Sequence, residues 1–167
     1  MKHRNLSMNN LIWPLKGIDP QLPPLHGQFG AIRKFDIHSG LDLYASKGTE
    51  VVCIEDCKVI DVFQFTGTNV ESPWWNDTWA VMTSGASGVV LYGELQPYVS
   101  IGSELQQGDT IGCLLPVLKR DKGLPMCMLH IEHYIEGTTS ICNPWYKLEE
   151  KEEKLLDPQV LLSKFFT

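Results

Sequence analysis

The chain has 167 residues with 14 Lys and Arg against 20 Asp and Glu, which gives a formal net charge of −6. This charge argues against nucleic acid as the main partner, because phosphate binding requires an excess of Lys and Arg on one face. With 43% hydrophobic and 20% charged residues, the composition is that of a globular protein and excludes a disordered, collagen-like or coiled-coil chain.

The length favours a single domain over residues 1–167, with three parts that differ in composition. Residues 1–35 are rich in Pro and Gly after position 13. This composition predicts an ordered loop that wraps around the core, with Trp13 and Phe29 as anchors. Residues 36–146 form the predicted β core. Residues 147–167 hold a charged segment followed by a helix.

The middle of the chain consists of short β-type runs separated by turns that contain Gly. Their spacing predicts an all-β sandwich or barrel of antiparallel sheets with long loops. At the end of the chain, Asp157 as N-cap and Pro158 at the first helical position predict a short C-terminal helix. The charged run 147–154 is predicted to be a solvated surface segment. The predicted strands cover residues 41–44, 50–54, 58–65, 79–83, 89–94, 110–115 and 128–135.

Cysteine usage and the N-terminal residues bear on the cellular location. The cysteines are odd in number, and their spacings match neither a disulfide framework nor CxxC pairs, which predicts reduced thiols. No apolar stretch of signal-peptide length follows the early basic residues, and no window reaches the ~18 apolar residues of a membrane span. We therefore expect a cytoplasmic location and no membrane span, with export by an unrecognised route left open. The sequence does not define an oligomeric state. The cysteines are Cys53, Cys57, Cys113, Cys127 and Cys142.

A nitrogen donor and an oxygen donor lie four positions apart at His38 and Asp42. Straight β geometry would hold these two positions ~13 Å apart, so they can share one metal only if the chain bends between them. Gly40 permits such a bend. The pair is a weak signal by itself, because a surface His beside a turn Asp gives the same pattern.

A second histidine, His130, lies in a run of strand character far along the chain. Alternation places His130 on one face with Met128 and Glu132, and His133 on the opposite face. A single histidine in such a strand is most simply a core residue with one hydrogen bond. Two His and one Asp together, however, supply three ligands and leave a fourth zinc position for water, which is the catalytic arrangement.

Five motifs then follow one another in a fixed order along the chain: Phe29-Gly30-Ala31-Ile32-Arg33, His38-Ser39-Gly40-Leu41-Asp42-Leu43, Gly48-Thr49-Glu50-Val51, the hairpin from Gly102 to Gly112, and Leu129-His130-Ile131-Glu132. In these motifs the chain, from about Trp13 to Tyr134, resembles the lysostaphin-like zinc metallopeptidases, which cut peptide cross-bridges of peptidoglycan. The resemblance implies their duplicated hybrid, or barrel-sandwich, fold and a peptide or muropeptide substrate. It also implies one Zn²⁺ per chain, bound by His38, Asp42 and His130.

Two positions beside the implied metal depart from the family pattern. Glu94 and Met128 stand where the family has histidines that assist the reaction. Methionine cannot exchange a proton, so Met128 contributes packing at most. Glu94 is a candidate general base that takes a proton from metal-activated water and hands it to the departing amine. The alternative is an exposed glutamate at a strand end with no role. We expect Glu132 to support the site or lie on the surface, without being a ligand.

The segment 71–79 places three tryptophans within six positions beside a proline. Exposed aromatic side chains on a loop can wall a groove for a peptide or glycan, which makes Trp74 and Trp75 candidate substrate-binding residues, with Asn76 as a polar contact. Core packing next to a turn explains the same residues equally well.

Two functional hypotheses follow from these residues. The first is a zinc-dependent metalloendopeptidase that hydrolyses peptide bonds in peptides such as those derived from peptidoglycan. The second is a catalytically silent metal-binding domain that binds cell-wall peptide or a protein partner, since retention of three ligands does not distinguish the two. The glycine hairpins also resemble biotinyl and lipoyl carriers and a glucose-type phosphotransfer domain. A carrier would need a Met-Lys-Met or Asp-Lys-Ala tip, which the chain lacks.

Overall fold

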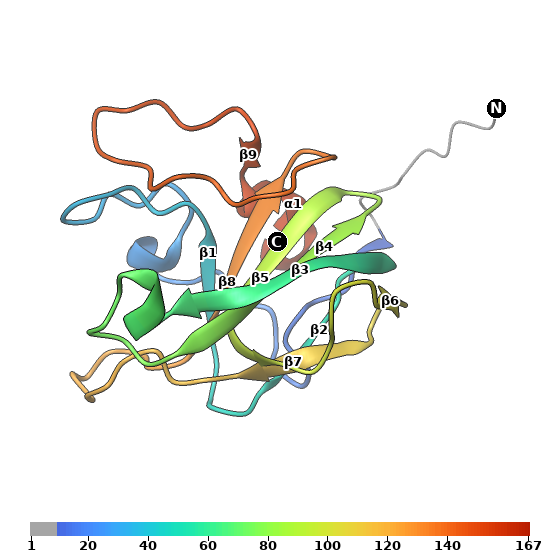
Figure 1. The fold of residues 1–167 in the computed structure, drawn as a ribbon, viewed down its shortest axis with the longest axis horizontal. Coiled ribbons are helices and arrows are strands. Elements are labelled where there is room, and N and C mark those ends of the chain that lie inside the picture. The colour runs from blue at the N-terminus through green and yellow to red at the C-terminus, as the bar shows by residue number, and fades with distance from the viewer. Residues whose placement is uncertain (1–9) are drawn as a thin grey trace.

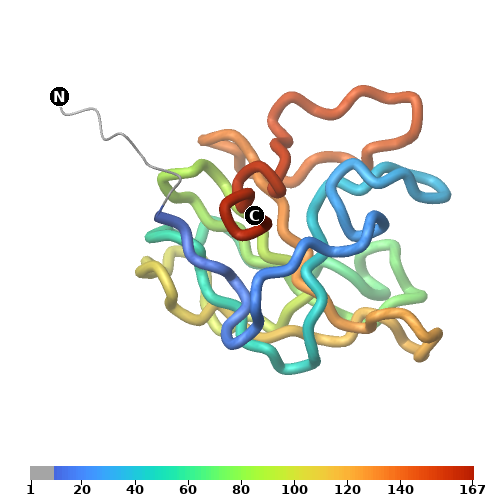
Figure 2. The backbone as a smooth tube through the Cα atoms, turned by 180° about the vertical axis from the view of Figure 1, so that it is seen from behind, coloured from blue at the N-terminus to red at the C-terminus, as the bar shows by residue number. Residues whose placement is uncertain are grey.

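A computed structural model describes residues 10–167 as an antiparallel β structure with a short C-terminal helix, shown in Figure 1 and from behind in Figure 2. The predicted all-β class is therefore confirmed. Residues 1–9 of the predicted wrapping loop lie outside the described residues. The strands are β1 (Leu41–Tyr44), β2 (Glu50–Val52), β3 (Cys57–Thr66), β4 (Thr78–Gly85), β5 (Gly88–Pro97), β6 (Glu104–Leu105), β7 (Thr110–Leu114), β8 (Met128–Tyr134) and β9 (Leu155–Leu156). The helix is α1 (Pro158–Leu161), and the 3-10 turns are η2 (Leu25–Gly27), η3 (Thr68–Val70) and η4 (Ser163–Phe166).

Strand β5 connects the two parts of the sheet. Its residues 89–93 pair with β8 and its residues 95–97 pair with β7, while β4 lies along its other edge. The main path of the sheet runs β1-β8-β5-β4-β3-β6, and β2 joins it through β7. The pairing of β1 with β8 matters most for function, because it sets Asp42 directly opposite His130.

Side chains from both faces of the sheet are buried, which explains the near-continuous apolar run of β5. Val90 and Tyr92 point into the larger core, whereas Val89 and Leu91 point into a second cluster on the opposite face. The period-2 alternation of a strand thus divides its residues between two cores. The second cluster includes Tyr134 of β8, the strand that also carries the candidate ligand His130.

The seven predicted strands are all present, with boundaries within three residues of those expected. Two short strands, β6 and β9, were not predicted, because a two-residue strand leaves no alternation to detect. The helix also begins as predicted: the Asp157 side chain accepts a hydrogen bond from the Gln159 backbone N–H at 2.8 Å, and Pro158 follows it. Within residues 10–167, no helix is long and apolar enough to cross a membrane, and all five cysteines are free thiols.

Three loops gather on one side of the molecule, formed by residues 28–36, 67–77 and 116–127. They lie at the left in Figure 1 and at the right in Figure 2.

The two aromatic side chains expected as anchors of the N-terminal part both make ring contacts. Trp13 packs against Phe165 with ring centroids 5.4 Å apart, and Phe29 packs against Trp145 at 5.7 Å.

Candidate metal centre

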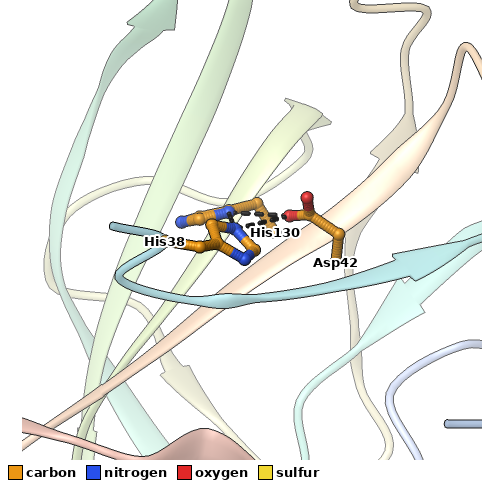
Figure 3. A group of neighbouring side chains, drawn as sticks. All are labelled: His38, Asp42 and His130. Carbon is orange, nitrogen blue, oxygen red and sulfur yellow. Dashed lines mark hydrogen bonds and ion pairs between the residues drawn. The ribbon is translucent and has the colours of Figure 1, made fainter. Parts of the chain in front are cut away.

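The three donors separated in sequence converge on one point, as Figure 3 shows. His38 lies just before β1, Asp42 in β1 and His130 in β8. The Oδ1 atom of Asp42 lies 3.2 Å from His38 Nε2 and 2.9 Å from His130 Nδ1, and the two nitrogens are 3.3 Å apart. A tetrahedral zinc ion with bonds of about 2.0 Å holds its ligand atoms about 3.3 Å apart. The three atoms are therefore spaced as zinc requires.

Gly40 makes this approach possible for two reasons. The chain bends there, as the spacing of His38 and Asp42 required. In addition, a Cβ atom at position 40 would lie 2.5 Å from Cε1 of His130 and 2.7 Å from the carbonyl oxygen of Ile131. The missing side chain is what allows the His130 ring to lie against the bend. The sequence predicted the bend but not this close contact.

Each histidine is oriented by a partner at its second ring nitrogen. His38 Nδ1 lies 2.9 Å from the backbone carbonyl oxygen of Gln28, and His130 Nε2 lies 2.9 Å from Oε1 of Glu132. Metal-binding histidines almost always donate their other N–H to a carbonyl or carboxylate, which fixes the tautomer and the ring orientation. Of the two positions expected for Glu132, the structure shows the one that supports the site and not the surface one, because Glu132 is buried and contacts His130.

The Asp42 carboxylate is held by three neighbours. Its Oδ2 atom accepts a hydrogen bond from Arg33 Nη2 at 3.0 Å, which leaves Oδ1 toward the two histidines. Burial raises the pKa of Asp42, but the hydrogen bonds to His130 and His38 outweigh burial and hold that pKa well below its usual range. Burial lowers the pKa of His130, yet Asp42 and Glu132 raise it overall. The carboxylate thus stays ionised, as a metal ligand must be.

The donor set fits zinc. Two imidazole nitrogens and one carboxylate oxygen are common zinc ligands, and three protein ligands are the number found in catalytic sites. Among residues 10–167, this is the group of at least three His, Cys, Asp or Glu donors with spacing suited to a metal ion. A ring of Phe65 packs 5.3 Å from that of His130, so the ligands have an apolar wall on one side.

Glu94 is buried, so the exposed position expected in the alternative is wrong, while its chemical role stays a prediction. Tyr92 pairs with Val81 and Leu95 with Trp79, so that two residues of β5 oppose one of β4. This bulge places Glu94 in the left-handed region, with φ +68°, a conformation that costs a non-Gly residue about 1–3 kcal/mol. Bulges often re-aim a side chain next to an active site.

The Glu94 carboxyl group interacts electrostatically with the candidate ligands Asp42 and His130. Its Oε2 atom is buried and has no hydrogen-bond partner within the described residues. Burial, with a further contribution from the Asp42 charge, raises the pKa of Glu94 to about 8, while His130 and Arg33 act in the opposite direction. A buried carboxyl with a pKa near neutrality is a typical feature of a general base.

The other two residues of β8 considered above lie on different faces. Met128 is half-buried and pairs with Tyr44 across the sheet. His133 lies on the face opposite His130, where its Nε2 contacts the carbonyl oxygen of Ser87 at 2.8 Å. Burial lowers the pKa of His133, which favours the neutral ring.

The tryptophan segment forms part of the loop 67–77. Trp74 is 63% exposed, whereas Trp75 and Asn76 are half-buried. The Asn76 amide donates to the carbonyl oxygens of Pro116 and Leu118 at 3.1 and 3.2 Å. Those bonds fasten loop 67–77 to loop 116–127 and leave Trp74 as the most accessible side chain of the three.

Sequence reasoning assigned no role to three residues that complete the cluster. Arg33 ends the first of the five motifs, so the motif itself was the available signal. Tyr134 shares the alternating face of His130 and Glu132, and its hydroxyl donates to Glu132 Oε2. The Gln28 contact is made by a backbone carbonyl and leaves no signal in the residue type.

Comparison with known proteins shows the fold. No protein-family model and no curated protein matches the chain. The crystal structure of CbpA from L. salivarius REN aligns with a TM-score of 0.60 and 17% identity over 94% of this chain and 97% of that one. The solution structure of lysostaphin aligns with a TM-score of 0.52 and 16% identity over 95% of this chain, which spans 52% of that protein. The fold is therefore lysostaphin-like, as the sequence motifs predicted.

Proposed function

We propose that the chain is a zinc-dependent metalloendopeptidase that hydrolyses peptide bonds, with peptides derived from peptidoglycan as candidate substrates. One observation carries the proposal. The Glu94 carboxyl group has a buried Oε2 atom without a hydrogen-bond partner among residues 10–167, and the group interacts electrostatically with Asp42 and His130, two of the three donors spaced for zinc. In a purely structural zinc site such a group would have no chemical role, because four protein ligands fill the coordination sphere and leave no position for water.

Each residue of the candidate site has a distinct role in the proposed reaction. His38, Asp42 and His130 would hold Zn²⁺, which supplies a Lewis acid for the scissile carbonyl and lowers the pKa of water. Glu94 accepts the proton of the attacking water at Oε2 and returns it to the nitrogen of the departing amine. Arg33 keeps the Asp42 carboxylate turned toward the histidines.

The fold and an exposed aromatic side chain favour a peptide as the candidate substrate. The lysostaphin-like fold and the resemblance of the motifs both favour a cell-wall peptide. Trp74, exposed on loop 67–77, offers a flat apolar surface for such a chain. We further propose that Trp75 and Asn76 fix this loop against loop 116–127 and act on substrate through Trp74. The free thiols support action in a reducing compartment.

A catalytically silent metal-binding domain is the second candidate, and Met128 is the observation that favours it. A methionine beside the ligands removes one proton-transfer group that the family uses. In this alternative the site binds zinc and a cell-wall peptide or protein partner, and the buried Glu94 carboxyl has no chemical role.

The test compares Glu94→Gln with the unmodified protein for zinc content and for cleavage of a library of peptides and muropeptides. We expect about one zinc per chain in both proteins, and a loss of cleavage of at least about 100-fold in the variant. Glu55→Gln is the matched control, because Glu55 is an equally buried carboxylate that contacts Ser87 at the turn between β4 and β5. Equal cleavage by Glu94→Gln would remove Glu94 from the mechanism. Zinc binding by the unmodified protein without cleavage of any peptide or muropeptide in the library would favour the silent domain.

A further inference from the structure

A chain of hydrogen bonds leads away from the candidate ligand His130. Its Nε2 lies 2.9 Å from Oε1 of Glu132. The other carboxylate oxygen of Glu132 accepts a hydrogen bond from the Tyr134 hydroxyl group. The Tyr134 oxygen in turn accepts a hydrogen bond from the backbone N–H of Cys142 at 2.9 Å. Ser39 also donates to Oε1 of Glu132, at 3.0 Å. Both oxygens of the Glu132 carboxylate are therefore held, one by Ser39 and one by Tyr134.

Cys142 belongs to a segment of residues 137–152, here called the strap, which crosses the outside of the molecule between β8 and β9. Figure 1 shows the strap in orange-red above β8. It also touches the chain next to the other histidine. The carbonyl oxygen of Trp145 accepts the N–H of Ile37 at 2.7 Å, directly before His38. The strap thus braces the approach to both histidine ligands.

The orientation of His130 depends on this arrangement. The ring has to present Nδ1 to the metal, which requires the proton on Nε2 and a carboxylate to accept it. A glutamate carboxylate turns easily about its last bond, so a single contact at one oxygen leaves its direction poorly defined. The Tyr134 hydroxyl fixes the second oxygen, and Tyr134 is itself fully buried in the second hydrophobic cluster.

We propose that Tyr134 is a positioning residue for the metal site: through Glu132 it holds the His130 ring with Nδ1 toward the metal, and through Cys142 it couples that ring to the docking of the strap. The proposal rests on the proposed metal site. Because coupling between two sites is reciprocal, metal binding also strengthens the docking of the strap. The stability of strap docking therefore depends on whether the metal site is occupied.

The test measures the zinc dissociation constant of Tyr134→Phe by competition with a chromogenic chelator. We expect zinc binding weaker by about tenfold or more, the usual effect of losing a partner behind a metal ligand. Glu132→Gln is the second variant and should show at least the same loss. Tyr92→Phe is the matched control, since Tyr92 is equally buried and its hydroxyl oxygen accepts a single backbone bond, from Ile54. That control should bind zinc as the unmodified protein does.

Hydrogen exchange at the Cys142 amide tests the coupling separately. Zinc should slow this exchange in the unmodified protein and in Tyr92→Phe, and leave it unchanged in Tyr134→Phe. If the unmodified protein binds no zinc, the proposed function fails together with the site. If it binds zinc and Tyr134→Phe binds zinc equally well, the site stands and the positioning role of Tyr134 is refuted. A Cys142 amide that does not respond to zinc in the unmodified protein refutes the coupling.

Discussion

Replacement of Glu94 by Gln should change how the stability of the metal-free protein depends on pH. In the unfolded chain the carboxyl group ionises around its ordinary pKa of 4.5, whereas burial and Asp42 raise the pKa to about 8 in the folded protein. Between these two values the folded state binds one more proton than the unfolded state, so stability falls as pH rises. Glutamine cannot ionise and removes this dependence.

The expected size follows from the two pKa values. The slope from Glu94 is about −1.4 kcal/mol per pH unit between pH 4.5 and 8, which accumulates to about 3 kcal/mol at pH 7. Glu94→Gln should therefore gain up to about 3 kcal/mol relative to the unmodified protein between pH 4.5 and 7. An unpaired buried amide costs about 1–3 kcal/mol at every pH, so the change in slope is the diagnostic quantity and not the offset.

Urea unfolding at pH 5, 6, 7 and 8 in the presence of a chelator measures this difference. Asp42 and His130 also change stability with pH, but they are present in both proteins, so the difference between the two slopes measures Glu94 together with its effect on their titration. Saturating zinc should reduce the difference, because a nearby dication lowers the pKa of the carboxyl group. If the free energies of unfolding of the two proteins without zinc change with pH in parallel, the raised pKa of the buried Glu94 is refuted.

The remaining predictions concern the ligands and their surroundings. His38→Ala and His130→Ala should each abolish stoichiometric zinc binding in metal analysis, and unchanged metal content would disprove the site. Gly40→Ala should both destabilise the protein by about 1–3 kcal/mol and weaken zinc binding, because the new methyl group displaces the His130 ring. Gly48→Ala, at φ +82° in open space, should cost about 1 kcal/mol and leave zinc binding intact. Trp74→Ala should raise KM for peptide cleavage while unfolding stability stays within about 0.5 kcal/mol.

The elements that the sequence predicted are those with a local signal. Strands such as β1 and β8 alternate over four or more residues, and the Asp157-Pro158 pair begins the helix by its own chemistry. Strand β9 consists of two leucines after a charged run, and Leu155 pairs with Tyr134 and is buried in the second cluster. That pairing joins parts of the chain that no local pattern connects.

The candidate site divides in the same way. The three ligands belong to short motifs, and the register of β1 against β8 then brings Asp42 and His130 together. The burial of Glu94 could not be predicted, because it depends on a bulge that appears only when β5 pairs with β4. The same holds for the strap, whose contacts with Ile37 and Tyr134 bring together segments that no motif links.

Glu94 also contributes to the charge balance of the site. Asp42, Glu94 and Glu132 contribute −3 when all are ionised, and Arg33 contributes +1, so the metal-free site carries −2 when its histidines are neutral. The charges of Asp42 and Glu132 add to burial, the largest cause, in raising the pKa of Glu94 to about 8. A zinc dication brings the sum to zero and favours the ionised Glu94. A histidine at this position would add no negative charge, so the site with zinc bound and neutral histidines would carry +1. Glu94 is therefore competent as a base mainly when the metal is present, which ties proton transfer to metal occupancy.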